Sequence, residues 1–226
     1  GASYTASNAT GGCVSFRGGG KGGIVMAGSS AMTSTPSGME EGPAAFRFDF
    51  DRFERMFELG ILDGQGPRVE LLEGRIVEMA PMSADHADVA AALIGALGVA
   101  LRQDTKASGL RVSAGATLRI GRDSAPEPDV LVARRRAGEK YYDALDAALV
   151  VEVSISTRAD DLRIKGPLYA RAGVPELWIV EPETRQIRVL REPRSDGSWG
   201  HEIVVAEGAV TPMFSDRVRI DLSQLF

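Results

Sequence analysis

The sequence predicts an α/β fold in which a mixed sheet is flanked by helices, preceded by a hairpin and followed by a meander of strands. Three observations predict it. Apolar residues recur at helical spacing in the segments 84–104 and 160–172. Short apolar runs, "DVLVA", "ALVVEVS" and "ELWIV", are typical of strands that are buried on both faces. Strands of alternating apolar and polar residues follow them. The order is helix, three strands, helix, strand, with a meander at the end.

The composition is that of an ordinary globular protein. Among the 226 residues, 44% are hydrophobic and 25% are charged, which excludes collagen-like, disulfide-scaffold and wholly disordered chains. No run of about 18 apolar residues occurs, so we expect no membrane span and a cytoplasmic protein. One cysteine and two histidines exclude a zinc site of the usual Cys/His kind. The net charge of −5 provides no overall positive field, so any contact with nucleic acid needs a local basic patch.

Residues 1–43 differ from the rest of the chain. They contain 11 of the 26 glycines and only four charged residues, without a sustained hydrophobic period. We interpret this segment as a disordered leader. A cloning remnant, or a start codon placed too far upstream, is the alternative. The segment lacks the basic start and apolar stretch of a secretory signal. Residues 44–226 are predicted to form one domain.

In the first half of this domain, the sequence predicts two helices separated by a hairpin. Aromatic residues and a methionine at helical spacing between Phe48 and Phe57 indicate a short helix that stops near Gly60. "RVELLEG" and "RIVEMAP" alternate around Glu73-Gly74, which indicates a hairpin. Ser83 can cap a long helix over 84–104. Gly95 and Gly98 weaken that helix, so we expect close packing against a sheet there.

The second half predicts the remaining strands and one more helix. "LRVSAGATLRI", "PDVLVA" and "ALVVEVS" are expected as strands. A helix over 160–172 contains Pro167 and ends at Gly173, and "VPELWIV" is the next buried strand. "RQIRVLR", "HEIVVA" and "DRVRIDL" alternate, so we expect them to be later and more exposed strands.

Three charged residues stand where an apolar core is expected. Glu152 lies in the middle of a buried strand, where an uncompensated carboxylate costs several kcal/mol. Asp129 begins the neighbouring apolar strand, and Lys165 follows early in the next helix. Two carboxylates on adjacent strands can share a divalent cation, and a lysine can polarise the attacking water or neutralise charge at phosphorus. This set of groups suits a phosphodiester hydrolase. A structural ion pair between Glu152 and Lys165 or Arg163 is the alternative.

Several strings in the chain support a family resemblance. "RVELLEGRIVEMAPMSADH", "SAPEPDVLVA", "VVEVSIST" and "KGPLYARAGVPELWIVEP" resemble the Uma-type family of restriction endonucleases within the PD-(D/E)XK nuclease superfamily, from about Phe48 to the C-terminus. The resemblance implies a restriction-endonuclease-like αβββαβ core, with Asp129 and Glu152 as metal ligands and Lys165 as the catalytic lysine.

One departure from the wider superfamily concerns the lysine. The usual E-x-K pattern places it two residues after the glutamate, on the same face of the strand. Ser154 occupies that position here. The family resembled supplies its lysine from the following helix, so we expect Lys165 to take this place.

Two further residues match positions of the family pattern. His86 lies in the first turn of the long helix, and we interpret it as a partner of the site or a phosphate contact, with a hydrogen bond at the helix start as the alternative. Glu70 is expected to face the same pocket, or to be an exposed hairpin residue. Glu127 shares strand parity with Asp129 and is a further candidate ligand.

A basic run follows the strand that Asp129 begins. We assign Arg134, Arg135, Arg136 and Lys140 to nucleic-acid binding because neighbouring tyrosines could stack on bases; a solvated loop is the alternative. We therefore expect a Mg²⁺-dependent endonuclease, with Mn²⁺ as a substitute, that hydrolyses DNA through metal-activated water and acts as a homodimer. The alternatives are a catalytically silent nucleic-acid-binding or scaffold protein on the same fold, and hydrolysis of RNA or a small phosphoester.

Overall fold

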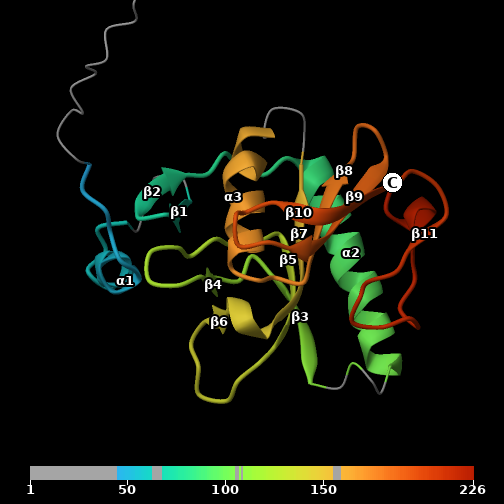
Figure 1. The fold of residues 1–226 in the computed structure, drawn as a ribbon, viewed down its shortest axis with the longest axis horizontal. Helices are drawn as coiled ribbons and strands as arrows, with labels where there is room; N and C mark the ends of the chain where they lie inside the picture. Colours follow the sequence, from blue (N-terminus) through green and yellow to red (C-terminus); the bar gives the residue numbers. More distant parts are fainter. Residues whose placement is uncertain (1–44, 63–67, 105–106, 108, 155–158) are drawn as a thin grey trace, which may run out of the picture. The chain divides into compact units, whose positions relative to one another are not determined.

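A six-stranded mixed sheet forms the centre of this protein (Figure 1). The computed structural model describes residues 45–62, 68–104, 107, 109–154 and 159–226, with only the backbone described for 159–162. The helices are α1 (Phe50–Glu58), α2 (Ala84–Gln103) and α3 (Ala159–Arg171), with 3₁₀ turns at Ala144–Asp146 and Leu222–Gln224. The prediction of a leader over residues 1–43 lies outside the described residues.

Most strands follow the predicted order along the chain, but "LRVSAGATLRI" is divided into two strands, and the short strands at 142–143 and 209–210 were not predicted. The strands are β1 (Val69–Leu72), β2 (Arg75–Glu78), β3 (Leu110–Ala114), β4 (Leu118–Arg119), β5 (Val130–Arg134), β6 (Tyr142–Asp143), β7 (Ala147–Val153), β8 (Glu176–Glu181), β9 (Gln186–Pro193), β10 (Trp199–Val205), β11 (Ala209–Val210) and β12 (Ile220–Asp221). The central sheet has the order β10-β9-β8-β7-β5-β3. In this sheet β7 and β8 pair in parallel, because α3 connects them as a crossover. The predicted α/β fold with a mixed sheet is confirmed.

The two faces of the sheet are covered by different helices. Val130 and Val132 of β5 point to the face on which α2 packs through Val89, Leu93 and Leu97. The alternate residues of the same strand, Leu131 and Ala133, point to the other face, where α3 packs through Leu168 and Tyr169. A strand buried on both faces has no polar alternation, which is why "DVLVA" and "ALVVEVS" are continuous apolar runs.

The hairpin β1-β2 and helix α1 form a smaller core beside the sheet. Phe50 and Phe53 pack there on Leu71 and Ala125. The predicted hairpin is confirmed, and its turn residues Glu73 and Gly74 both have positive φ, 49° and 75°. A Cβ at Gly74 would lie 2.9 Å from the Cβ of Arg47, so this position requires glycine for space as well as for conformation. The hairpin is tied to the segment that leads into β5, because Ala125 N donates to Leu71 O at 2.7 Å.

Two expectations about these segments are wrong, and a third is confirmed. Gly95 and Gly98 do not approach the sheet, since a Cβ at Gly95 would meet nothing within 4 Å and one at Gly98 only the Arg102 side chain. "RQIRVLR" forms β9, which alternates buried Ile187 and Val189 with partly exposed residues and is more exposed than β8, as predicted. "DRVRIDL" contributes only β12, which pairs with β11 outside the central sheet, and buries Val218, Ile220 and Leu222 in the α2 core.

Helix α2 is long and apolar enough to cross a membrane, the one such helix in the part of the chain that the structure describes. Its Val89, Leu93 and Leu97 side chains are buried against the sheet. This packing is typical of the core helix of a globular domain. The expectation that the protein has no membrane partner stays a prediction.

Candidate active site

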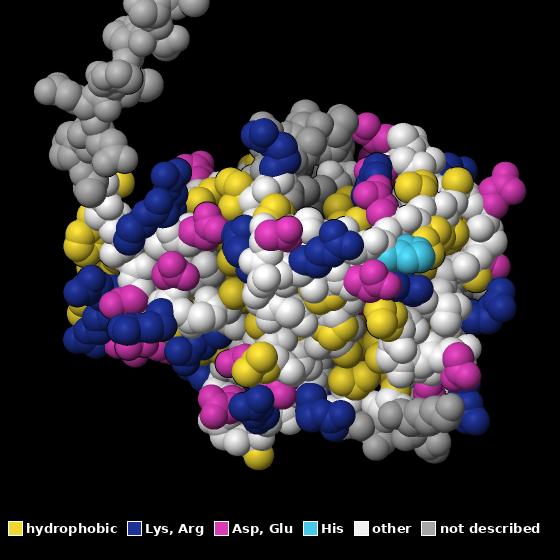
Figure 2. Space-filling view, viewed as in Figure 1, with side chains coloured by type: hydrophobic (Ala, Val, Ile, Leu, Met, Phe, Trp, Pro, Cys, Tyr) yellow, Lys and Arg dark blue, Asp and Glu magenta, His cyan; other side chains and the backbone are white. Residues whose placement is uncertain are grey.

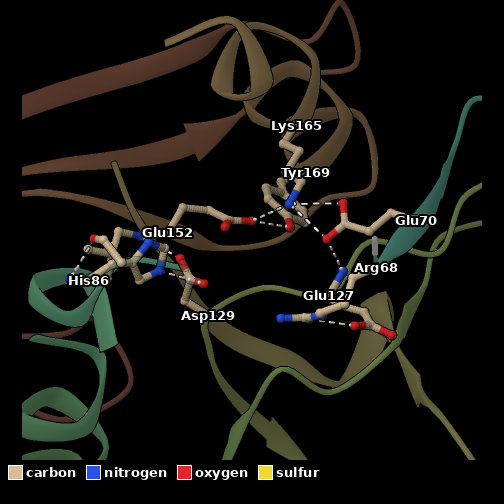
Figure 3. A network of polar contacts seen from close by, with 10 residues as sticks. Arg68, Glu70, His86, Glu127, Asp129, Glu152, Lys165 and Tyr169 are labelled. Carbon is tan, nitrogen blue, oxygen red and sulfur yellow. Dashed lines mark hydrogen bonds and ion pairs between the residues drawn. The ribbon is translucent and has the colours of Figure 1, made fainter. Parts of the chain in front are cut away.

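Asp129 and Glu152 lie opposite each other at one end of the sheet. Val130 of β5 pairs with Val151 of β7 in an antiparallel register. The next pair outward is therefore Asp129 and Glu152, and directly opposite residues share one face with their Cβ atoms about 5 Å apart. Both side chains line one pocket, together with Glu70 and Lys165 (Figure 3). The structure thus brings together the two carboxylates that the sequence singled out.

Both oxygens of Asp129 are held by neighbours. Oδ2 accepts a hydrogen bond from Val153 N at 2.8 Å, and Oδ1 lies 2.8 Å from His86 Nε2. His86 is buried at the start of α2, where its backbone N–H donates to the capping Ser83 hydroxyl at 3.3 Å. The contact of His86 with Asp129 agrees with its interpretation as a partner of the site.

Lys165 reaches the carboxylates from α3. Its Nζ lies 3.0 and 2.9 Å from the two oxygens of Glu70 and 3.6 Å from Glu152 Oε1. The side chain is buried, so the ammonium points into the sheet edge rather than into solvent. The predicted migrated lysine therefore lies beside Glu152, although Ser154 occupies the position two residues after it. The structural ion pair of Glu152 with Lys165 is part of the same arrangement.

Tyr169 is a site residue that sequence reasoning missed. It lies one helical turn after Lys165, and its hydroxyl donates to Glu152 Oε1 at 2.6 Å. Both residues are fully or almost fully buried. The only signal was the spacing of four residues after Lys165, which places the two side chains on one face of α3, but a tyrosine in an apolar stretch also suits a core. Oε2 of Glu152 makes no hydrogen bond within the described residues, so it remains open to a ligand.

Burial and mutual repulsion shift the protonation of these groups. Burial, reinforced by the charges of Asp129 and Glu70, raises the pKa of Glu152 to about 7, against the opposing effects of Lys165 and Tyr169. Burial also raises the pKa of Glu70. The pKa of Lys165 is raised because the surrounding carboxylates outweigh the effect of its burial. Perturbed groups that converge in one pocket are typical of functional sites.

Glu127 lines the same pocket as Asp129, and its role as a further ligand stays a prediction. Its Oε2 pairs with Arg68 Nη2 at 2.7 Å and its Oε1 accepts from the Thr117 hydroxyl at 3.3 Å. Its backbone N–H donates to Glu70 Oε1 at 3.0 Å. Glu127 and Arg68 therefore form the outer wall of the pocket, connected through Glu70 to Lys165 (Figure 3).

The basic residues predicted to bind nucleic acid lie elsewhere. Arg134 ends β5, whereas Asp129 precedes its first residue, so the strand separates them by about 17 Å. Arg136 pairs with Asp146 at 2.6 Å and Lys140 with Glu54 at 2.7 Å, while Arg135 lies over the ring of Tyr142. The structure does not bring this group to the carboxylates, and its role in binding stays a prediction. Figure 2 shows one face of the molecule, on which Lys and Arg side chains are interspersed with Asp and Glu rather than gathered into one basic surface.

The pocket offers donors that suit a hard divalent cation. Mg²⁺ is commonly held by one or two carboxylates and completes its shell with waters and substrate phosphates. Asp129 and Glu152 present two carboxylates beside an opening to solvent, with Glu152 Oε2 available. Within the described ranges, no group of three or more histidine, cysteine, aspartate or glutamate side chains could hold a metal. The residues thus fit a cation that is completed by water and substrate rather than a closed protein cage.

Comparisons with known proteins show the family and the fold of the chain. A family model named Uma2 and described as "Putative restriction endonuclease" matches residues 50–219. Among solved structures, the chain is similar to a protein from Anabaena variabilis described as "a putative nuclease belonging to DUF820", with a TM-score of 0.60 and 16% identity. That similarity covers 76% of this chain and 96% of the other, and it shows a common fold. No curated protein matches.

Proposed function

The chain belongs to the Uma2 family of restriction-endonuclease-like proteins, and on that basis we propose that it is a divalent-metal-dependent endonuclease that hydrolyses DNA phosphodiester bonds. The metal we propose is Mg²⁺, with Mn²⁺ as a substitute. Asp129 and Glu152 would hold it, and it would supply charge stabilisation and an activated water. No covalent intermediate on the protein is required.

The observation that carries the proposal is the convergence of Asp129, Glu152 and Lys165 in one pocket. Asp129 directly precedes β5, whereas Glu152 comes from β7 and Lys165 from α3. If Lys165 served only to form a structural ion pair, one carboxylate beside it would be enough. Lys165 instead lies among several carboxylates, two of which have raised pKa values, next to solvent. Such an arrangement is costly for stability and suits a site that binds a cation.

The side chains have separate tasks in hydrolysis. Val153 N–H and His86 fix the orientation of the Asp129 carboxylate, and the Tyr169 hydroxyl fixes that of Glu152. The Lys165 ammonium, 3.6 Å from Glu152 Oε1, can orient the attacking water or neutralise the charge that develops on the phosphoryl oxygens. The carboxylate of Glu152 must be ionised to serve as a ligand, so its proton has to leave before a cation can bind.

A plasmid assay tests the proposal. Purified protein is incubated with supercoiled DNA in Mg²⁺ or Mn²⁺, with and without EDTA, beside the variants Asp129→Ala and Glu152→Ala. We expect the wild type to nick DNA only when metal is present and both variants to fall to background. Isothermal titration with Mn²⁺ should show uptake by the wild type that the two variants lose.

Other outcomes separate the alternatives. Equal nicking by all three proteins would show that the activity does not come from these residues. Retained DNA binding without nicking or metal uptake would favour the catalytically silent nucleic-acid-binding protein. Cleavage of RNA or a small phosphoester with the same residue dependence would reassign the substrate. Linear product formed at the same rate as nicked product would support a homodimer that cuts both strands, which light scattering can check.

A further inference from the structure

The candidate active site has an unfavourable charge balance for a phosphodiester. Four carboxylates line it, those of Glu70, Glu127, Asp129 and Glu152. Only two cationic side chains lie among the described residues that line the same pocket, Arg68 and Lys165. A nucleic acid adds a negative charge for each phosphate. A substrate phosphate therefore needs a positive group that it can reach from solvent.

Lys165 is poorly placed to meet an incoming phosphate first. Its side chain is only 4% exposed, and both oxygens of Glu70 occupy its ammonium. Arg68 is different, because 55% of its side chain is exposed at the mouth of the same pocket. Of the two cations, Arg68 is thus the one that solvent and a large ligand can contact.

The backbone and side chain of Arg68 are both fixed. Its carbonyl oxygen accepts from Met79 N at 2.7 Å, which ties it to the second strand of the hairpin. Its Nη2 pairs with Glu127 Oε2 at 2.7 Å, and Glu127 is itself held by Thr117. A guanidinium carries five N–H donors in a planar fork. The contact with Glu127 uses Nη2 alone, so donors on Nε and Nη1 remain for a second anion.

We propose that Arg68 binds a backbone phosphate of the nucleic-acid substrate at the mouth of the active site, with Glu127 holding its guanidinium in position. The inference rests on the proposed function for the class of substrate. Planar, multi-donor recognition of phosphate is the geometry for which arginine is suited. The contact carries no base information, so it positions the substrate without selecting a sequence.

A binding experiment tests this directly. Fluorescence anisotropy of two labelled duplexes of unrelated sequence is measured in Ca²⁺ over a series of salt concentrations, with gels to verify that the DNA stays intact. Arg68→Ala should weaken binding about tenfold for both duplexes. The slope of log K against log salt should fall by about 1, as expected for the loss of one phosphate contact.

Two further variants sharpen the test. Arg188→Ala is a matched control, because Arg188 also pairs with glutamates but lies on β9 outside the pocket. It should change neither the affinity nor the slope. Arg68→Lys keeps the charge but loses the fork, so it should keep the slope while weakening binding less than the alanine variant.

The results that would overturn the role of Arg68 can be distinguished from those that would overturn the proposed hydrolytic function. Unchanged affinity and slope in Arg68→Ala, or an equal loss in Arg188→Ala, would remove Arg68 from the substrate site even if the wild type nicks plasmid. Wild type that does not bind either duplex would also overturn it. Wild type that binds DNA through Arg68 but never nicks would leave the inference standing and defeat the hydrolytic function.

Discussion

The two ends of β5 both carry clusters of charged residues, and they differ in burial. At the start of the strand, Asp129 joins Glu152 and Lys165 in a buried group whose members shift one another's pKa values. At its end, Arg136 and Lys140 pair singly with carboxylates at the surface, Asp146 and Glu54. The buried group has more carboxylates than one lysine can compensate, whereas each surface pair is already balanced.

This difference in burial bears on the chemical task that we propose for Asp129, Glu152 and Lys165. A solvated pair costs little to form and contributes little. A buried group with unequal charges costs free energy, and chains retain such a cost where it serves function. The comparison therefore predicts that equivalent substitutions at the two ends of β5 have unequal effects.

The largest difference is expected between two lysines. Lys165→Met should reduce metal-dependent nicking to background, because the substrate phosphate loses the only buried cation near Glu152 among the described residues. Lys140→Met should leave the nicking rate at saturating DNA unchanged, because its ammonium pairs with Glu54 and lies over Tyr141, away from the carboxylates. If Lys140 binds DNA as predicted, the variant should only need more DNA to reach that rate. Both variants are assayed on supercoiled plasmid, with circular dichroism to verify folding. A similar loss in both would remove the distinction between the two ends.

The next largest effect concerns how the free energy of unfolding depends on pH. The pKa of Glu152 is about 7 in the folded protein and its ordinary value is 4.5, so the folded state holds this proton more tightly than the unfolded state does. The free energy of unfolding should therefore fall as the pH rises from about 4.5 to 7, by at most about 3 kcal/mol. Urea unfolding of metal-free protein at pH 5 and pH 8 measures this change.

Glu152→Gln is the control for this prediction, because an amide cannot ionise. The variant should lack that part of the pH dependence and gain stability relative to the wild type as the pH rises. Parallel pH profiles for the two proteins would show that Glu152 does not titrate in this range. Metal should reverse the trend in the wild type, because a bound cation favours the ionised carboxylate.

A smaller effect is expected from a single hydroxyl. Tyr169→Phe removes the hydrogen bond to Glu152 Oε1, which both orients the carboxylate and favours its ionised form. Mn²⁺ affinity measured by isothermal titration should fall by about 10- to 100-fold, the range seen when partners of metal ligands are removed. Tyr142→Phe is the matched control, because the Tyr142 hydroxyl contacts Ser113 rather than Glu152. The Mn²⁺ affinity of this variant should equal that of the wild type. Equal affinities in all three proteins would contradict a positioning role for Tyr169.

Much of the site could be predicted from the sequence because the key residues violate local patterns. Glu152 interrupts an apolar strand, and a carboxylate in such a place indicates either a functional site or a structural ion pair. The family resemblance added Glu70, which strand alternation alone left undecided, and His86, for which a hydrogen bond at the helix start was the alternative. The structure places both in contact with the predicted group.

The residues that were missed or misplaced depend on long-range geometry. Tyr169 lies in a segment that is apolar by composition, so nothing local shows that its hydroxyl reaches another element. Arg134 follows Asp129 closely in sequence, but a five-residue strand carries the chain to the opposite end of the sheet. Arg68 and Glu127 form an ion pair although 59 residues separate them in the sequence, and a local hydrophobic period cannot predict such a long-range pair.

The fold shows the same limit. The buried strands were predictable from continuous runs of apolar residues, and the two long helices from apolar residues at helical spacing. The reduction of "DRVRIDL" to the two-residue β12 was not, because an alternating pattern does not distinguish a strand from an irregular segment whose apolar side chains Val218, Ile220 and Leu222 reach the core. Gly95 and Gly98 were misread because poor helix formers are tolerated on an outer face as well as at a close contact.

The placement on a helix of the lysine that we propose as catalytic has a practical use in searching genomes for related chains. In this chain the lysine comes thirteen residues after the glutamate of an apolar strand, and a tyrosine comes four residues after the lysine. With this spacing α3 returns to the end of β7, and both side chains contact the glutamate. Scans that demand a lysine two positions after the glutamate would discard such chains as inactive. A query built on the longer spacing would recover them.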